Sequence, residues 1–169
     1  MQFCIQSNIE GLDRILDLIN SAYRGTTGAG RWTSEHHLVS GDRIEREALI
    51  SLIEHSDSEL IVGYDDATVV ACIAVKRHTG VVEFGTFAVA PELQGLGLGS
   101  TLLEYAEAHA RGYGNRFQVC VVSQNTDLIN FYERRGYERT GERLPYPVDQ
   151  NVGKPKIADI SLTVLEKIL

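Results

Sequence analysis

Apolar residues recur at the three- and four-residue spacing of an amphipathic helix in four segments of the chain. These segments are residues 12–23, 44–53, 98–110 and 128–132. Asn8 and Gly25 predict the beginning and the end of the first helix, and Asn125 predicts the beginning of the last, because these residue types cap helices. Asp42 followed by Glu45 resembles a capping box for the second helix. We therefore expect four helices.

Outside these helices the pattern changes to alternating or continuous apolar runs, which are typical of strands. The runs lie at residues 2–7, 60–64, 68–76, 81–90, 116–123, 137–148 and 156–167. Asp65-Asp66 and His78-Thr79-Gly80 join three of them into antiparallel hairpins, and Pro91 ends the last of these three. The order of elements predicts an α/β (α+β) fold in a single domain over residues 1–169. We expect a mixed sheet with helices on both faces.

The charge of the chain restricts its partners. Asp and Glu number 23 against 16 Lys and Arg, which gives a net charge of −7. Nucleic acids and anionic membranes bind basic surfaces, so we expect neither as a partner. An acidic protein instead favours cationic partners, amines among them.

The sequence also bears on the compartment. The N-terminus has no basic region before an apolar core, and no apolar run approaches the roughly 20 residues that span a bilayer. Cys4, Cys72 and Cys120 each lie in an apolar run and resemble buried small hydrophobic residues in a reducing compartment. No cysteine or histidine cluster has zinc spacing, so we expect no metal. These features predict a cytoplasmic protein and leave a homodimer open.

The most informative segment is residues 87–100, where a strand runs through a glycine-rich turn into a helix. Glycines allow positive φ and let a ligand approach the main chain. The free N–H groups in the first turn of the helix can then bind phosphate. The turn lacks the lysine of a P-loop, and its glycine spacing does not fit the GxGxxG dinucleotide pattern. The alternative is a turn that only directs the path of the chain.

The turn Gln94-x-x-Gly97-x-Gly99 is similar to the Q/R-x-x-G-x-G/A pyrophosphate loop of the GNAT superfamily of N-acetyltransferases. Residues 87–91 (FAVAP), before the loop, match the same family. Asn125 with residues 131–137 (FYERRGY) resembles a later family segment. The resemblance extends over essentially the whole chain. It implies a GNAT-like, mainly antiparallel sheet with two splayed parallel central strands.

The resemblance implies that acetyl-CoA is the acyl donor and binds between the splayed strands. The main chain of Phe87, Ala88 and Val89 would hold the pantetheine arm. Asn125 would contact the arm from the other side, would cap its helix, or would do both. The loop that would hold the pyrophosphate consists of Gln94, Gly95, Leu96, Gly97, Leu98, Gly99 and Ser100.

Acetyl transfer by direct attack needs a neutral amine, a donor to the carbonyl oxygen and a proton for the departing thiolate. Tyr132 matches the family's leaving-group acid, and its alternative is an aromatic core residue. In the family a backbone N–H is the oxyanion donor, here that of Val89. Glu83 interrupts an apolar strand and is the candidate base, with a salt bridge to Lys76 or Arg77 as its alternative. Many members of the family use waters in place of one base.

Residues 24–42 show little periodicity and correspond to the family's acceptor pocket. Tyr23, Trp32 and Glu35 are candidate acceptor residues, because a tryptophan and a carboxylate can hold an ammonium. Simple packing or exposure is the alternative for each. The sequence thus predicts an acetyl-CoA-dependent N-acetyltransferase for a primary amine, with a small amine favoured over a protein lysine or N-terminus. A non-catalytic acyl-CoA-binding or sensing module is the alternative from another class.

Overall fold

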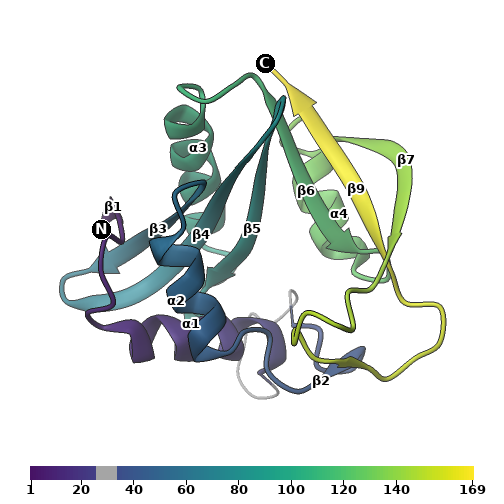
Figure 1. Cartoon of the computed structure of the whole chain (residues 1–169), viewed down its shortest axis with the longest axis horizontal. Helices are drawn as coiled ribbons and strands as arrows, with labels where there is room; N and C mark the ends of the chain where they lie inside the picture. Colours follow the sequence, from purple (N-terminus) through teal and green to yellow (C-terminus); the bar gives the residue numbers. More distant parts are fainter. Residues whose placement is uncertain (26–33) are drawn as a thin grey trace.

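The computed structural model describes residues 1–25 and 34–169 and contains a seven-stranded sheet (Figure 1). Its strands are β1 (Gln2–Ile5), β3 (Ser58–Asp65), β4 (Thr68–His78), β5 (Val81–Val89), β6 (Arg116–Val122), β7 (Glu138–Pro145) and β9 (Ser161–Ile168). Across the sheet their order is β1-β3-β4-β5-β6-β9-β7. Every neighbouring pair is antiparallel except β5 and β6. The mixed, mainly antiparallel sheet that we expected is confirmed.

The two parallel strands separate along their length. β5 and β6 pair at Val82, Glu83 and Phe84 and no further. In Figure 1 they diverge from this paired end, and β9 follows β6 away from β5. Within residues 1–25 and 34–169, the remainder of β5, from Gly85 to Val89, therefore has no neighbouring strand on its β6 side. The splayed central strands implied by the resemblance are confirmed.

Helices cover both faces of the sheet, as expected. α1 (Leu12–Arg24) and α2 (Arg46–Glu54) pack in one core cluster, and α3 (Leu98–Ala110) and α4 (Thr126–Glu133) pack in the other. The alternation along β3 illustrates the division, because Leu60 and Val62 face α1 and α2, whereas Ile61 faces α3 and α4. In the described part of the chain, no helix combines the length and apolarity needed to span a membrane.

Gly25 ends α1 as predicted, but the predicted N-caps of the first two helices are wrong. Gly11 adopts a φ of 70° and turns the chain into α1, so the helix begins later than expected. The Asn8 side chain instead accepts a hydrogen bond from the Glu10 amide at 2.9 Å. Glu45 stands at the N-cap of α2 and makes no side-chain hydrogen bond there, so Asp42 starts no capping box.

A two-stranded ribbon was not predicted. β2 (Val39–Ser40) pairs with β8 (Lys154–Pro155) and joins the α1–α2 connection to the β7–β9 connection (Figure 1). The expected strands at residues 137–148 and 156–167 are accordingly shorter than predicted. Leu38, Val39, Val122 and Tyr146 form a small core cluster beside this ribbon. The ribbon thus brings two loops together next to the end of β6.

Candidate active site

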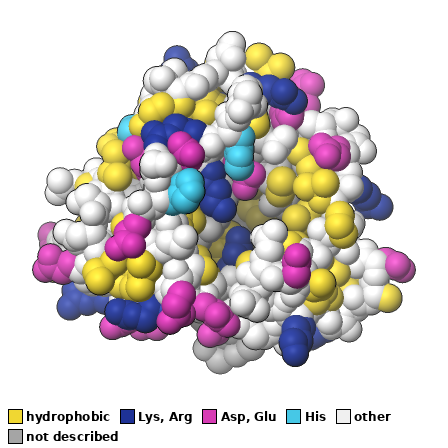
Figure 2. Space-filling view, viewed as in Figure 1, with side chains coloured by type: hydrophobic (Ala, Val, Ile, Leu, Met, Phe, Trp, Pro, Cys, Tyr) yellow, Lys and Arg dark blue, Asp and Glu magenta, His cyan; other side chains and the backbone are white. Residues whose placement is uncertain are grey.

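The splay opens into a cleft of about 1360 Å³. Figure 2 shows the hollow near the middle of this face, with hydrophobic side chains in its floor and Lys or Arg side chains inside it. Most residues singled out by the sequence line this cleft: Tyr23, Glu35, Glu83, Phe87, Val89, Gln94, Gly95, Gly97, Gly99, Ser100 and Tyr132. The side chain of Ala88 turns into the core under α1 and α2. Trp32 lies outside the described residues.

The glycine turn has the backbone conformation that its sequence predicts. Gly95 and Gly97 adopt φ angles of 81° and 88°, and Gly97 is the N-cap of α3. The first hydrogen bond of this helix runs from the Thr101 amide to the Gly97 carbonyl, at 3.1 Å. The preceding N–H groups of Leu98, Gly99 and Ser100 therefore have no acceptor within the helix. Free N–H groups at a helix N-terminus can bind an anion, and these lie at the wide end of the splay.

Arg135, to which the sequence analysis gave no role, lies beside these N–H groups. The Arg135 guanidinium is 3.6 Å from the Phe131 ring centroid and donates to the Phe131 carbonyl at 2.7 Å. It also donates to the Ser100 hydroxyl in the first turn of α3. Arg135 thus adds a positive charge to the helix N-terminus. The paired arginines before Gly136 were the available signal for it.

The end of β5 presents its backbone to the splay. The Ala90 amide donates to the Val70 carbonyl of β4 at 2.8 Å, so the N–H and C=O of Val89 point away from β4. The Gln94 Nε2 donates to the Val89 carbonyl at 3.1 Å. The Gln94 Oε1 is buried and has no hydrogen-bond partner among the described residues. The side chain of Gln94 therefore faces the strand and holds an unused acceptor there.

β5 is irregular in the middle of the splay. Its register with β4 shifts between Cys72 and Ala74, and Thr86 adopts a φ of 45°, which is strained for a β-branched residue. The Phe87 amide donates to the Tyr23 hydroxyl at 3.1 Å. Burial raises the pKa of Tyr23. Helix α1 therefore reaches the main chain of β5 at the point where the two central strands separate.

Tyr132 is a buried aromatic residue of the core whose hydroxyl has no partner among the described residues. Its side chain is buried and packs against the rings of Phe87, Phe131 and Tyr137, with centroids 6.4, 5.3 and 5.3 Å away. No described residue pairs with its hydroxyl, and the residue lines the cleft. Burial, together with nearby Tyr23, raises the pKa of Tyr132 well above its usual range. The phenol is thus protonated and faces the cleft.

Glu83 lies where β5 and β6 are still paired, at the narrow end of the splay. Its side chain is 30% exposed, so the burial expected from the sequence is partial. Its carboxylate is 3.3 Å from the His78 Nε2, so the partner is His78 and not Lys76 or Arg77. The Cys120 thiol lies near Glu83. Burial, together with the charge of Glu83, raises the pKa of this thiol to about 11.

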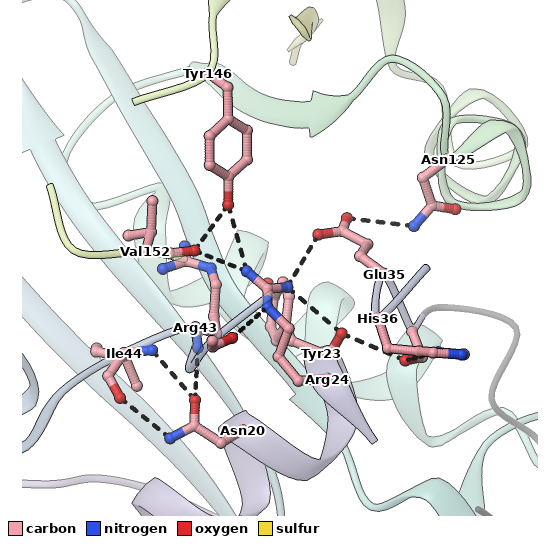
Figure 3. A network of polar contacts seen from close by, with 12 residues as sticks. Asn20, Tyr23, Arg24, Glu35, His36, Arg43, Ile44, Asn125, Tyr146 and Val152 are labelled. Atoms are coloured by element: carbon pink, nitrogen blue, oxygen red, sulfur yellow. Dashed lines mark hydrogen bonds and ion pairs between the residues drawn. The ribbon is translucent and has the colours of Figure 1, made fainter. Parts of the chain in front are cut away.

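Glu35 belongs to a buried polar network at another wall of the cleft (Figure 3). Its carboxylate is 3.4 Å from the Arg24 Nη1, and the two side chains are only 5% and 9% exposed. Arg24 also donates to the Val152 carbonyl at 2.8 Å and to the Tyr146 hydroxyl at 3.3 Å. The Asn125 amide donates to Glu35 Oε1 at 3.4 Å. Burial raises the pKa of Glu35, although Arg24 opposes the shift.

This network changes the interpretation of Glu35 and Asn125. The Glu35 carboxylate is held by Arg24 of α1 and by Asn125 at the start of α4, so it braces the cleft wall. Asn125 caps α4 as predicted, because its Oδ1 accepts from the Leu128 amide at 3.2 Å. Sequence reasoning missed Arg24 and Tyr146, which join α1 to the loop after β7. It also missed Arg43, whose side chain lies in the same cleft.

Within the described residues, no group of three His, Cys, Asp or Glu side chains could hold a metal ion. The three cysteines are free, with Cys72 buried and the other two half-buried.

The chain is similar to known proteins both in sequence pattern and in fold. The model of the acetyltransferase (GNAT) family matches residues 12–137, which is well over half of the chain. Among curated proteins, no sequence matches this chain. Solved structures do match over its full length.

Three of these structures are N-acetyltransferases with different names. The PaiA N-acetyltransferase of Thermoplasma acidophilum in complex with coenzyme A is 20% identical, with a TM-score of 0.68 and 100% of both chains covered. The ribosomal-protein-alanine N-acetyltransferase of Brucella melitensis is 19% identical, with a TM-score of 0.73 and 100% of both chains covered. An aminoglycoside 6'-N-acetyltransferase complexed with coenzyme A is 14% identical, with a TM-score of 0.69, 99% of this chain and 97% of that chain covered. The named acceptors differ, so the shared fold leaves the acceptor open.

Proposed function

The chain belongs to the GNAT family of acetyltransferases, and we propose that it transfers the acetyl group of acetyl-CoA to the primary amine of a small acceptor by direct attack. One observation carries this proposal. The unpaired edge of β5 leads from the phosphate-binding turn before α3 to the Tyr132 hydroxyl in a single cleft.

The residues of the cleft fit acetyl-CoA. The N–H groups of Leu98, Gly99 and Ser100, with Arg135 beside them, suit the pyrophosphate. The edge of β5 that lacks a neighbouring strand suits the amide-containing pantetheine arm, which can bond main-chain groups that remain available there, such as the Val89 N–H. Gln94 Oε1 is a buried acceptor without a donor among the described residues, and an amide N–H of the arm would satisfy it.

Acetyl-CoA supplies the thioester, and the residues around it supply orientation and proton transfer. The Val89 N–H, which points into the splay, is the proposed donor to the carbonyl oxygen as negative charge develops. The Tyr132 hydroxyl is the proposed proton source for the departing thiolate. Glu83 is the proposed base for the acceptor ammonium, either directly or through a water. Both Glu83 and Tyr132 line the same cleft.

The surroundings of the cleft favour a small acceptor over a protein. The β2–β8 ribbon and the Arg24 contacts tie the loop after α1 to the loop after β7. Both loops contribute residues to the cleft wall, among them Glu35 and Tyr146. A protein lysine or N-terminus would be expected to need an open groove in this place. An acetyltransferase for proteins is therefore the second candidate.

The experiment that tests the function is an assay of free CoA release against a panel of amines, amino acids and peptides, with acetyl-CoA binding measured by calorimetry. Acceleration by a small amine supports the proposal, and acceleration by peptides alone supports the protein acetyltransferase. Binding of acetyl-CoA without acceleration by any acceptor would indicate a non-catalytic binding or sensing module. The absence of both acetyl-CoA binding and acceleration by any acceptor would refute an acetyl-CoA-dependent function.

A further inference from the structure

Arg43 is held in a fixed position on the wall of the cleft. The Asn20 Oδ1 of α1 accepts hydrogen bonds from the amides of Arg43 and Ile44 at 2.8 and 3.2 Å. The Asn20 Nδ2 donates to the Ile44 carbonyl at 3.1 Å. Ile44 is itself buried in the core under α1 and α2. The backbone that carries the Arg43 side chain is therefore anchored on both sides of that residue, as Figure 3 shows.

The guanidinium of Arg43 lies over the ring of Tyr23, 5.1 Å from its centroid. The hydroxyl at the far end of that ring accepts the hydrogen bond from the Phe87 amide. The charge of Arg43 is thus one tyrosine side chain away from the β5 edge along which the thioester is proposed to lie. One small molecule can reach both places.

No carboxylate of the described residues forms an ion pair with Arg43. The charge of Arg43 opposes the rise in the pKa of Glu35, but the Glu35 carboxylate is bonded to Arg24 and Asn125. The eight residues from 26 to 33 contain no Asp or Glu, so they have no carboxylate to offer either. The half-buried Arg43 guanidinium therefore has no ion pair among the described residues, and its N–H groups can donate to the anion of a ligand.

The phosphates of the acyl donor are unsuited as this anion. Their proposed site, at Gly97 and Arg135, belongs to α3 and α4 on one face of the sheet. Arg43 precedes Ile44, which packs with α1 and α2 on the other face. The acceptor approaches the thioester from that second side if the donor occupies the first. The anion that pairs with Arg43 therefore belongs to the acceptor.

We propose that the acceptor is an amine that carries a carboxylate, as an α-amino acid does, and that Arg43 binds this carboxylate. The planar guanidinium can donate two parallel hydrogen bonds to a carboxylate, which fixes its orientation as well as its charge. The amine beside it is then directed towards the β5 edge. This inference rests on the acetyltransferase function proposed above and specifies its substrate class.

Matched pairs of acceptors test the inference on the unaltered enzyme. Each pair consists of an α-amino acid and its carboxamide, which share the amine and the side chain. The amine of the carboxamide is less basic, so a larger fraction of it is deprotonated at neutral pH. A preference for the acid therefore cannot come from a larger fraction of reactive, deprotonated amine. We expect kcat/KM for the acid to exceed that for the carboxamide by about 10- to 100-fold.

Variants of Arg43 connect this preference to the residue. In Arg43→Ala the preference falls to within about threefold, and Arg43→Lys retains an intermediate preference because it keeps the charge without the planar fork. The matched control is Arg46→Ala, which removes an arginine that pairs with Asp13 outside the cleft and leaves the preference unchanged. The KM for acetyl-CoA stays within about twofold in all three variants, and thermal unfolding confirms that each one is folded.

Calorimetry separates this inference from the proposed function. The same pairs are titrated into the protein saturated with CoA, where no reaction occurs. Binding of the acid alone, lost in Arg43→Ala, supports the carboxylate site even if no turnover is found. Acetylation of carboxamides and simple alkylamines as fast as the acids would overturn the inference and leave the acetyltransferase function intact. Equal binding of both members of a pair, or an unchanged preference in Arg43→Ala, would overturn it too.

Discussion

The hydroxyl of Tyr23 on α1 accepts a hydrogen bond from the main-chain amide of Phe87 on β5, at 3.1 Å. The contact lies one residue beyond Thr86, whose φ of 45° breaks the regular course of the strand. It connects the helix that carries Arg24 and supports Arg43 to the strand along which the acyl donor is proposed to lie. The cleft wall that carries Arg24 and Arg43 is therefore connected to the β5 edge by the Tyr23 side chain.

Replacing Tyr23 with phenylalanine tests how much this hydrogen bond contributes to the free energy of unfolding. Tyr23→Phe leaves the Phe87 amide without its acceptor, so we expect the free energy of unfolding to fall by about 1–3 kcal/mol. Urea denaturation measures the change. The control is Tyr105→Phe on α3, whose 41% exposed ring should give a change within about 0.5 kcal/mol. Equal stabilities of the two variants would contradict the prediction.

Gly97 can be compared with a glycine of the same conformation elsewhere. Gly97 and Gly80 have φ angles of 88° and 78°, and a Cβ on either would meet no atom within 4 Å. Alanine at either position should therefore cost a similar 1–2 kcal/mol of stability, roughly the penalty of left-handed backbone. Only Gly97→Ala adds a side chain to the phosphate turn, and it should weaken acetyl-CoA binding by about tenfold or more. Calorimetry that found equal affinities for the two variants would exclude the turn as the pyrophosphate site.

Glu35 offers a test of the buried network. Glu35→Ala leaves the Arg24 guanidinium buried without its counter-charge, which should reduce the free energy of unfolding by about 3–5 kcal/mol. Asp13→Ala removes one partner of an exposed ion pair with Arg46 and should cost less than about 1 kcal/mol. Chemical denaturation of both variants gives the comparison. A loss no larger for Glu35 than for Asp13 would show that the network contributes little.

The pH dependence of turnover follows from the environment of Tyr132. Burial raises the pKa of this phenol well above its usual value of about 10, and its proposed role requires the protonated form. The proton is therefore present at neutral pH and is lost only as pH rises above that range. We expect kcat to rise as the acceptor amine loses its proton, without a descending limb below about pH 10. A descending limb near pH 8 that is absent in Tyr132→Phe would contradict this.

The order of strands and helices was predictable because the apolar period changes sharply between them. The N-caps of α1 and α2 were not, since Asn8 and Asp42 have the right residue type but Gly11 and Glu45 take the N-cap positions. The β2–β8 ribbon has strands of two residues, which are too short to show any period. Such strands form only because distant segments meet.

For the site, too, the features that depend on local sequence were predictable and those that depend on distant contacts were not. Val89, Gln94 and the glycines lie in one continuous motif, which local sequence can reveal. The bond from Arg24 to Tyr146 joins residues 122 positions apart, and no local pattern indicates it. The net charge of −7 suggested a cationic acceptor, yet Arg43 stands in the cleft without an acidic partner among the described residues. Total charge thus says little about the charge that a substrate meets at one site.

In the proposed reaction an amine attacks the thioester in the splay, and Tyr132 protonates the departing thiolate. The most direct measurement is kcat of Tyr132→Phe against the unaltered enzyme, with acetyl-CoA affinity determined alongside. General acid catalysis contributes about 10²- to 10⁴-fold, so we predict a fall in kcat of that size while acetyl-CoA affinity stays within about twofold. Full turnover in Tyr132→Phe would contradict the account.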